Sequence, residues 1–184
     1  MTLLEKSGTP IGSYAPDFEL RGIDDEVHHL ARYLDKFRAV GVVFMGNHCP
    51  CVQLYIERLK KLQASFHHTG FTLIGINPND PTQDSQESFD NMKSFGVRGS
   101  FNFPYLYDST QDVTRSFGAQ KTPMVFLVDD KGIVRYKGGI DDNAQKPEAV
   151  QMQYLWDAAS ALLAGSVIDP TSTEPCGEEV KWRQ

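Results

Sequence analysis

The junction between a buried strand and a cysteine, in the first third of the chain, constrains the fold more than any other stretch. Residues 39–44 read Ala-Val-Gly-Val-Val-Phe, an apolar run that predicts a strand buried on both faces. A Gly-Asn turn follows. Pro50 then stands where a first helical position belongs, and apolar residues recur at helical spacing as far as Phe66. We therefore expect Cys49 at the N-terminus of a helix that begins where a central strand ends.

This position gives Cys49 the chemistry of a nucleophile. Free backbone N–H groups and the positive end of the helix dipole favour a thiolate over a thiol. The alternative is a structural cysteine that packs as a small buried hydrophobic residue. The order strand, turn, Cys-Pro and helix favours the nucleophile, because an inert cysteine gains nothing from that place.

The spacing of the second cysteine is Cys-x-Cys, because Cys51 lies two residues after Cys49. A disulfide between them would close a very small ring, so we expect it to be labile and oxidising if it forms. Two alternatives stay open at this point. Cys51 packs in the first helical turn, or it binds a metal with His48 and Cys49, although three ligands within four residues surround a tetrahedral zinc poorly.

Composition limits the class of protein. The chain has 184 residues, 40% of them hydrophobic, and a formal charge of −6, which predicts one globular domain and argues against nucleic-acid or anionic-membrane partners. No apolar run is long enough to cross a bilayer and the start lacks a signal-peptide pattern, so we expect a cytoplasmic location. Three cysteines are too few for a disulfide scaffold, which favours reactive thiols.

The remaining pattern predicts alternating strands and helices in a single domain, residues 1–184, with a core at about 15–165. Met1–Tyr14 is expected as a surface arm. In the extension 166–184, residues 169–179, which include Cys176, have no core-forming pattern, and a hydrophobic end, Val180-Lys181-Trp182, follows them. The Thr122-Pro123 bond, at the start of a strand, could be cis. The expected elements are a hairpin at 15–30, helices at 30–36, 50–69 (with Gly70 as its C′ residue), 85–95 (with Ser85 as its favoured cap and Ser88 as a weaker one), 111–117 and 148–163, and strands at 71–76, 103–107 (at an edge), 123–129 and 133–139.

This order resembles that of thioredoxin-fold proteins, and the chain is similar to the AhpC/TSA (redoxin) branch. The active-site motif that carries the closest resemblance is Asn-His-Cys-Pro at residues 47–50. The resemblance implies an α/β thioredoxin-like fold, with a central mixed sheet flanked by helices, an N-terminal β-hairpin and a C-terminal tail. Further supporting stretches are Ala15–Phe18, Ile76–Asp80, Asn102–Asp108, Thr122-Pro123 and Ile140–Asn143.

The resemblance also implies roles for residues. Cys49 would be the nucleophile, and Pro123 would be a cis-proline beside which a peptide or thiol substrate binds. Cys51 is the nearest candidate for a resolving thiol; Cys176 is the other, because a mobile tail brings a distant thiol to the site at modest loop-closure cost, unless it only docks near the core with Trp182. The expected substrate-binding residues are Asn47, His48, Pro50, Thr122 and Pro123. His48 would stabilise the thiolate or donate a proton, and the alternative is an exposed turn histidine with no role in the reaction.

Two departures from related motifs bear on the reaction. Val52 replaces the second cysteine of a Cys-x-x-Cys motif, and Gly46 replaces the threonine or serine that lies three residues before a peroxiredoxin's cysteine. We expect a thiol-dependent oxidoreductase, acting in thiol–disulfide exchange or antioxidant defence on a thiol or disulfide of a protein or small molecule, with a cellular thiol reductant and no cofactor. The alternatives are a peroxiredoxin-like peroxidase of hydroperoxides and a non-catalytic binding or metal-carrier protein.

Overall fold

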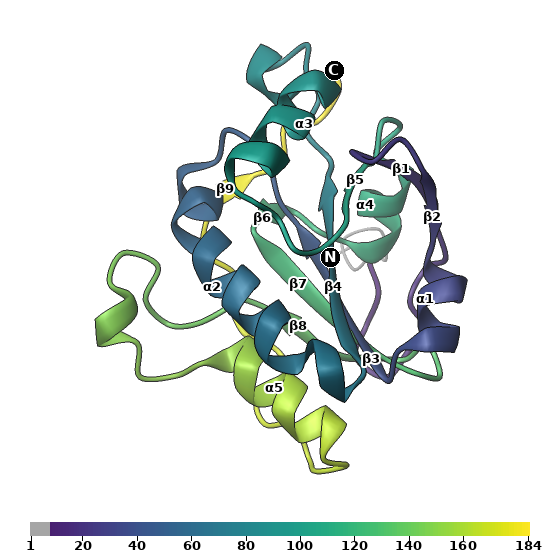
Figure 1. Cartoon of the computed structure of the whole chain (residues 1–184), viewed down its shortest axis with the longest axis vertical. Helices are drawn as coiled ribbons and strands as arrows, with labels where there is room; N and C mark the ends of the chain where they lie inside the picture. The colour runs from purple at the N-terminus through teal and green to yellow at the C-terminus, as the bar shows by residue number, and fades with distance from the viewer. Residues whose placement is uncertain (1–7) are drawn as a thin grey trace, which may run out of the picture.

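The computed structural model describes residues 8–184, and it has a seven-stranded mixed sheet at its centre (Figure 1). Residues 1–7 of the predicted N-terminal arm lie outside the described range. Strands β3, β4 and β5 run parallel, whereas β7 runs antiparallel to β3 and β8 antiparallel to β7. The order across the sheet is β2 (Val27–His29), β1 (Glu19–Gly22), β5 (Tyr105–Tyr107), β4 (Phe71–Asn77), β3 (Ala39–Phe44), β7 (Met124–Asp129) and β8 (Val134–Gly138).

Helices cover both faces of this sheet, as the α/β prediction requires. Alternate side chains of β3 point to opposite faces: Val43 packs in one hydrophobic cluster, and Val42 and Phe44 pack in the other. The first cluster includes residues of α2, α3 and α5, and the second those of α1 and α4 (Figure 1). The helices are α1 (Leu30–Lys36), α2 (Pro50–Phe66), α3 (Phe89–Arg98), α4 (Asp112–Phe117) and α5 (Tyr154–Leu163).

The start of α3 differs from the prediction. Ser85 does not cap a helix; it begins a 3-10 turn, Ser85–Glu87, in which Asp84 accepts a hydrogen bond from the backbone N–H of Gln86 at 3.0 Å. Ser88 is the cap of α3, and its side chain accepts from the N–H of Asn91 at 3.2 Å. The extra turn directs Glu87 into the interior, where it is 0% exposed.

Two further element predictions were wrong. Strand β5 is not at an edge, because the N-terminal hairpin adds β1 beside it; Pro104 precedes its paired residues and so interrupts no pairing. The last helix begins at Tyr154 rather than at residue 148. The segment before it leaves the helical path, because the backbone N–H of Gln151 donates to Asp142 Oδ1 at 3.0 Å and Met152 accepts from the N–H of Asp142 at 3.2 Å.

The C-terminal extension is built into the fold, and the segment predicted to lack a core-forming pattern, 169–179, contributes a strand. Strand β9 (Glu178–Glu179) pairs antiparallel with β6 (Lys121–Thr122), the short strand before Pro123 (Figure 1). The next residue, Val180, is 4% exposed. Among the described residues, no helix combines the length and apolarity that a membrane span requires.

Candidate active site

Cys49 lies where the sequence predicts, at the N-terminal cap of α2 and directly before Pro50. Its side chain is 1% exposed, and the thiol donates a hydrogen bond to the carbonyl oxygen of Thr122, with Sγ and O 3.3 Å apart. The Thr122–Pro123 peptide bond is cis. The fold therefore brings together three of the predicted site residues from positions more than 70 apart in the sequence.

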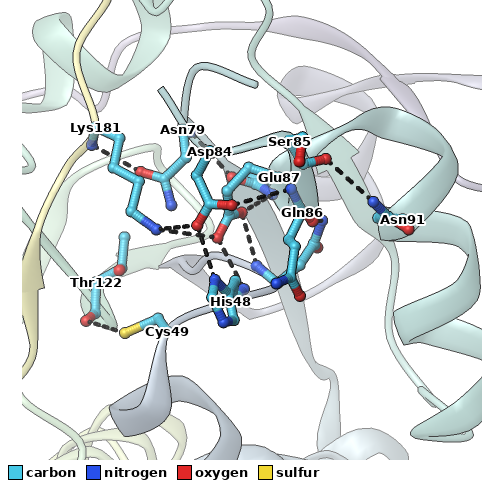
Figure 2. Close-up of polar contacts among 12 residues, drawn as sticks. His48, Cys49, Asn79, Asp84, Ser85, Gln86, Glu87, Asn91, Thr122 and Lys181 are labelled. Atoms are coloured by element: carbon cyan, nitrogen blue, oxygen red, sulfur yellow. Dashed lines mark hydrogen bonds and ion pairs between the residues drawn. The ribbon is translucent and has the colours of Figure 1, made fainter. Parts of the chain in front are cut away.

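A buried carboxylate, Glu87, holds the turn that leads to the cysteine, and sequence reasoning missed it. Its two oxygens accept hydrogen bonds from the backbone N–H groups of Asn47 and His48, each at 2.8 Å (Figure 2). The side-chain amide of Asn77 donates to the same carboxylate at 2.9 Å. Charge-assisted bonds of this kind are stronger than neutral ones, so Glu87 fixes the backbone immediately before Cys49.

The side chain of Asn47 takes part in the same support. Its amide nitrogen donates to the carbonyl of Gln86 at 3.0 Å, and its oxygen accepts from the hydroxyl of Tyr105 at 2.7 Å. Burial raises the pKa of Tyr105 well above its usual value, and the nearby charge of Glu87 raises it further. Asn47 is 6% exposed, so in this structure its side chain holds the turn rather than facing solvent.

A network of charged groups lies beside the turn. His48 Nδ1 is 2.8 Å from a carboxylate oxygen of Asp84, and Lys181 Nζ is 2.8 Å from the same oxygen and 3.7 Å from Glu87 (Figure 2). The hydrogen bond from Lys181 holds the pKa of Asp84 well below its usual value, and the bond from His48 adds to this effect. Burial alone would lower the pKa of Lys181, but Asp84 and Glu87 raise it overall.

Gly46 has no room for a side chain. A Cβ atom at this position would lie 2.4 Å from the amide nitrogen of Asn79 and 3.0 Å from a carboxylate oxygen of Glu87. The space that a threonine or serine would need is therefore filled by these two side chains. The packing of the site therefore leaves no space for a peroxiredoxin-type hydroxyl at position 46.

The structure pairs Cys51 with Cys176 in a disulfide across 125 positions of the sequence, and leaves Cys49 as the free thiol. The Cys49–Cys51 disulfide considered from the sequence is not formed in this state. A metal site of His48, Cys49 and Cys51 is not assembled either, because His48 pairs with an aspartate and Cys51 is in the disulfide. Within residues 8–184, no group of three or more His, Cys, Asp or Glu side chains is arranged to hold a metal ion.

Comparisons with known proteins identify the family of the chain. Residues 11–137 match the model of the AhpC/TSA family. Thiol-disulfide oxidoreductase ResA of Geobacillus thermodenitrificans is 27% identical over 71% of this chain and 70% of its own. Thiol:disulfide interchange protein DsbE of Escherichia coli K12 is 26% identical over 82% of this chain and 76% of its own.

Two solved structures resemble almost the whole chain. A hypothetical protein from Sinorhizobium meliloti has a TM-score of 0.89 and 30% identity, over 96% of this chain and 97% of that one. An uncharacterised conserved protein from Geobacillus kaustophilus has a TM-score of 0.88 and 31% identity, over 95% and 93%. The fold and the matches define a redoxin with a thioredoxin-like fold. The chain belongs to the AhpC/TSA family, and the predictions of the fold, of this branch and of an oxidoreductase are confirmed.

Proposed function

We propose that the protein catalyses thiol–disulfide exchange with Cys49 as the nucleophile. The observation that carries the proposal is the place of Cys49, at the start of α2 and against the carbonyl oxygen of Thr122. The Cys49 thiolate attacks one sulfur of a substrate disulfide. A Cys49–substrate disulfide forms, and the other substrate sulfur leaves as a thiolate that takes up a proton.

A second thiol then completes the exchange. Cys51, two residues into the same helix, or Cys176 attacks the mixed disulfide once it is itself reduced; the substrate leaves as a thiol, and a disulfide to Cys49 remains. A cellular thiol reductant restores the dithiol form with two electrons and two protons. The substrates are disulfides of proteins or small molecules, and the cytoplasmic location stays a prediction.

Disulfide exchange is favoured over peroxide reduction by the packing around Gly46. A peroxidase of the type considered from the sequence would bind the peroxide through a hydroxyl at this position. Asn79 and Glu87 occupy that space, and the backbone N–H groups of the turn donate to Glu87 instead of facing a ligand. These contacts support a site that uses the thiol and excludes the peroxide.

The test compares two oxidants on the fully reduced protein. We expect oxidised glutathione to oxidise Cys49 far faster than one equivalent of hydrogen peroxide does, measured by thiol trapping and peptide mapping at timed intervals. The Cys49→Ser variant, which keeps Cys51 and Cys176, should lose disulfide exchange by at least about 100-fold. Faster oxidation of Cys49 by peroxide than by the disulfide would contradict the proposal and favour the peroxidase.

A further inference from the structure

The last residues of the chain, 174–184, form a strap across the proposed active site. The strap leaves the body of the protein after Thr173, whose backbone N–H donates to Lys137 at 3.1 Å. It is tied to α2 by the Cys51–Cys176 disulfide and then pairs with β6 through two residues. Figure 2 shows Lys181 reaching from it into the charged network beside Cys49.

The strap lies against the contact that holds the Cys49 thiol. A Cβ atom at Gly177 would lie 1.9 Å from the carbonyl oxygen of Thr122 and 3.2 Å from the ring of Pro123. This carbonyl is the acceptor of the Cys49 hydrogen bond. Thr122 and Pro123, expected from the sequence to face a substrate, are buried, and Cys49 is 1% exposed. The Cys49 thiol is therefore buried in the state in which the strap is seated.

The disulfide that ties the strap is far more open to solvent than the nucleophile. Cys176 is exposed and Cys51 is half-buried, whereas Cys49 is fully buried. An external thiol therefore meets the Cys51–Cys176 bond before it meets Cys49. A thiol in solution therefore reacts first with the Cys51–Cys176 disulfide and only afterwards with Cys49.

We propose that the Cys51–Cys176 disulfide is a second redox site, whose reduction by a dithiol frees residues 174–177 of the strap and opens Cys49. This inference rests on the proposed function, since it assigns the regulation of the same thiol. A thiolate of the dithiol attacks the exposed sulfur of Cys176, and the Cys51 sulfur leaves as a thiolate that takes up a proton. The second thiol of the dithiol then attacks the mixed disulfide. Cys176 leaves as a thiol, the reductant becomes a disulfide, and two electrons and two protons have been transferred.

After reduction, the two parts of the strap are held unequally. Residues 178–184 stay anchored: β9 pairs with β6, the backbone N–H of Val180 donates to the carbonyl of Gln120 at 2.9 Å, and the backbone of Lys181 donates to Asn79 and accepts from the N–H of Asp80, each at 2.9 Å. Residues 174–177, which lie over Thr122, are held by the Cys51–Cys176 disulfide and by the ion pair of Glu174 with Lys121 at 3.6 Å. The covalent tie is therefore the contact that keeps this part of the strap over Thr122, because an exposed ion pair contributes little.

The test measures access to Cys49 directly and needs no turnover. The intact protein, with its disulfide formed, is treated with N-ethylmaleimide, and labelling of Cys49 is followed by peptide mass spectrometry. The same reaction is run on protein reduced with dithiothreitol and freed of the reductant. We expect Cys49 to be labelled at least ten times faster in the reduced protein. Equal rates in the two states would overturn the proposal.

A pair of glycine variants tests whether the strap itself is the cover. Gly177 has a φ of +122° and meets Thr122, so Gly177→Ala should unseat the strap while the disulfide stays intact, and should speed labelling of Cys49. Gly165→Ala is the matched control, because Gly165 also has a positive φ, +72°, but nothing within 4 Å. If both oxidised variants protect Cys49 as well as the unmodified protein does, the proposal fails.

The experiments distinguish a wrong proposal about the strap from a wrong proposal about catalysis. Protein that opens on reduction but does not exchange disulfides would refute the catalytic proposal and keep the second redox site. Protein that exchanges disulfides at the same rate whether or not the Cys51–Cys176 bond is formed would refute the strap and keep the catalytic role of Cys49.

Discussion

Replacing Glu87 by glutamine removes one charge from the interior and almost nothing from its shape. The carboxylate accepts three hydrogen bonds, from the backbone N–H groups of Asn47 and His48 and from the side chain of Asn77. A glutamine has a single acceptor oxygen. In its most favourable orientation, the amide oxygen still accepts from the N–H of Asn47 and from the side chain of Asn77. The NH₂ group then faces the N–H of His48 and the ammonium of Lys181.

The expected cost follows from these contacts. A buried donor left without an acceptor costs about 1–3 kcal/mol, and the remaining bonds lose the assistance of the charge. We therefore expect Glu87→Gln to lower the free energy of unfolding by about 2–4 kcal/mol. This is a large part of the roughly 5–15 kcal/mol that stabilises an ordinary domain.

Equilibrium unfolding in urea, with the disulfide intact, measures this loss. The matched control is Glu57→Gln on the exposed face of α2, where the side chain is 81% exposed and the change should be within about 0.5 kcal/mol. A loss for Glu87→Gln no larger than that of the control would refute the reasoning, since it would mean that the carboxylate does not hold the turn.

Three further predictions concern the core, the charged network and the turn. Leu59→Ala in the fully buried face of α2 should cost about 2–5 kcal/mol in urea unfolding, whereas Leu54→Ala, at a position 38% exposed, should cost well under half of that. The stability difference between the protein and Asp84→Asn should be constant from about pH 8 to 9 and should shrink as the pH falls below the ordinary value of 3.8, because a lowered carboxyl pKa contributes stability that is lost on protonation. The raised pKa of Lys181 moves the corresponding alkaline loss above 10.5. A difference that does not shrink at acidic pH would contradict the pairing. Gly46→Ser should lower stability by about 1–3 kcal/mol without faster oxidation of Cys49 by peroxide, and a gain in that rate would show that the position can hold a working hydroxyl.

The elements that carry local, periodic patterns could be predicted from the sequence. The run at 39–44, the Cys-Pro helix start and the proline before strand β7 each follow from short-range rules, and they place Cys49 and Pro123 correctly. Helix α2 ends at Phe66, and a 3-10 turn, His67–Thr69, completes the helical segment expected as far as Gly70, which is in the left-handed conformation at φ +95°. These features depend on few neighbours, so tertiary packing did not alter them.

The parts that depend on distant pairing could not be predicted. Glu87 is one charged residue in a polar stretch, and its burial depends on where the turn at Asn47 lies in space. Lys181 follows a tail segment, residues 169–179, whose composition resembles that of a disordered segment. A local signal existed for one partner, because Asp84 precedes a short turn and has the character of a cap. The Cys51–Cys176 pairing has no sequence signal, since three cysteines allow three pairings.

The central claim is that Cys49 is the thiol that attacks a disulfide, and a trapped intermediate tests it most directly. The double variant Cys51→Ser/Cys176→Ser has no resolving thiol and no disulfide tie, so Cys49 is its only cysteine. We expect incubation with oxidised glutathione to give a stable mixed disulfide with one glutathionyl group, mapped by mass spectrometry to the Cys49 peptide, many times faster than in the same protein unfolded in urea. A folded variant that forms this adduct no faster than the unfolded chain would contradict the claim, because the structure around Cys49 would then contribute nothing to its reactivity.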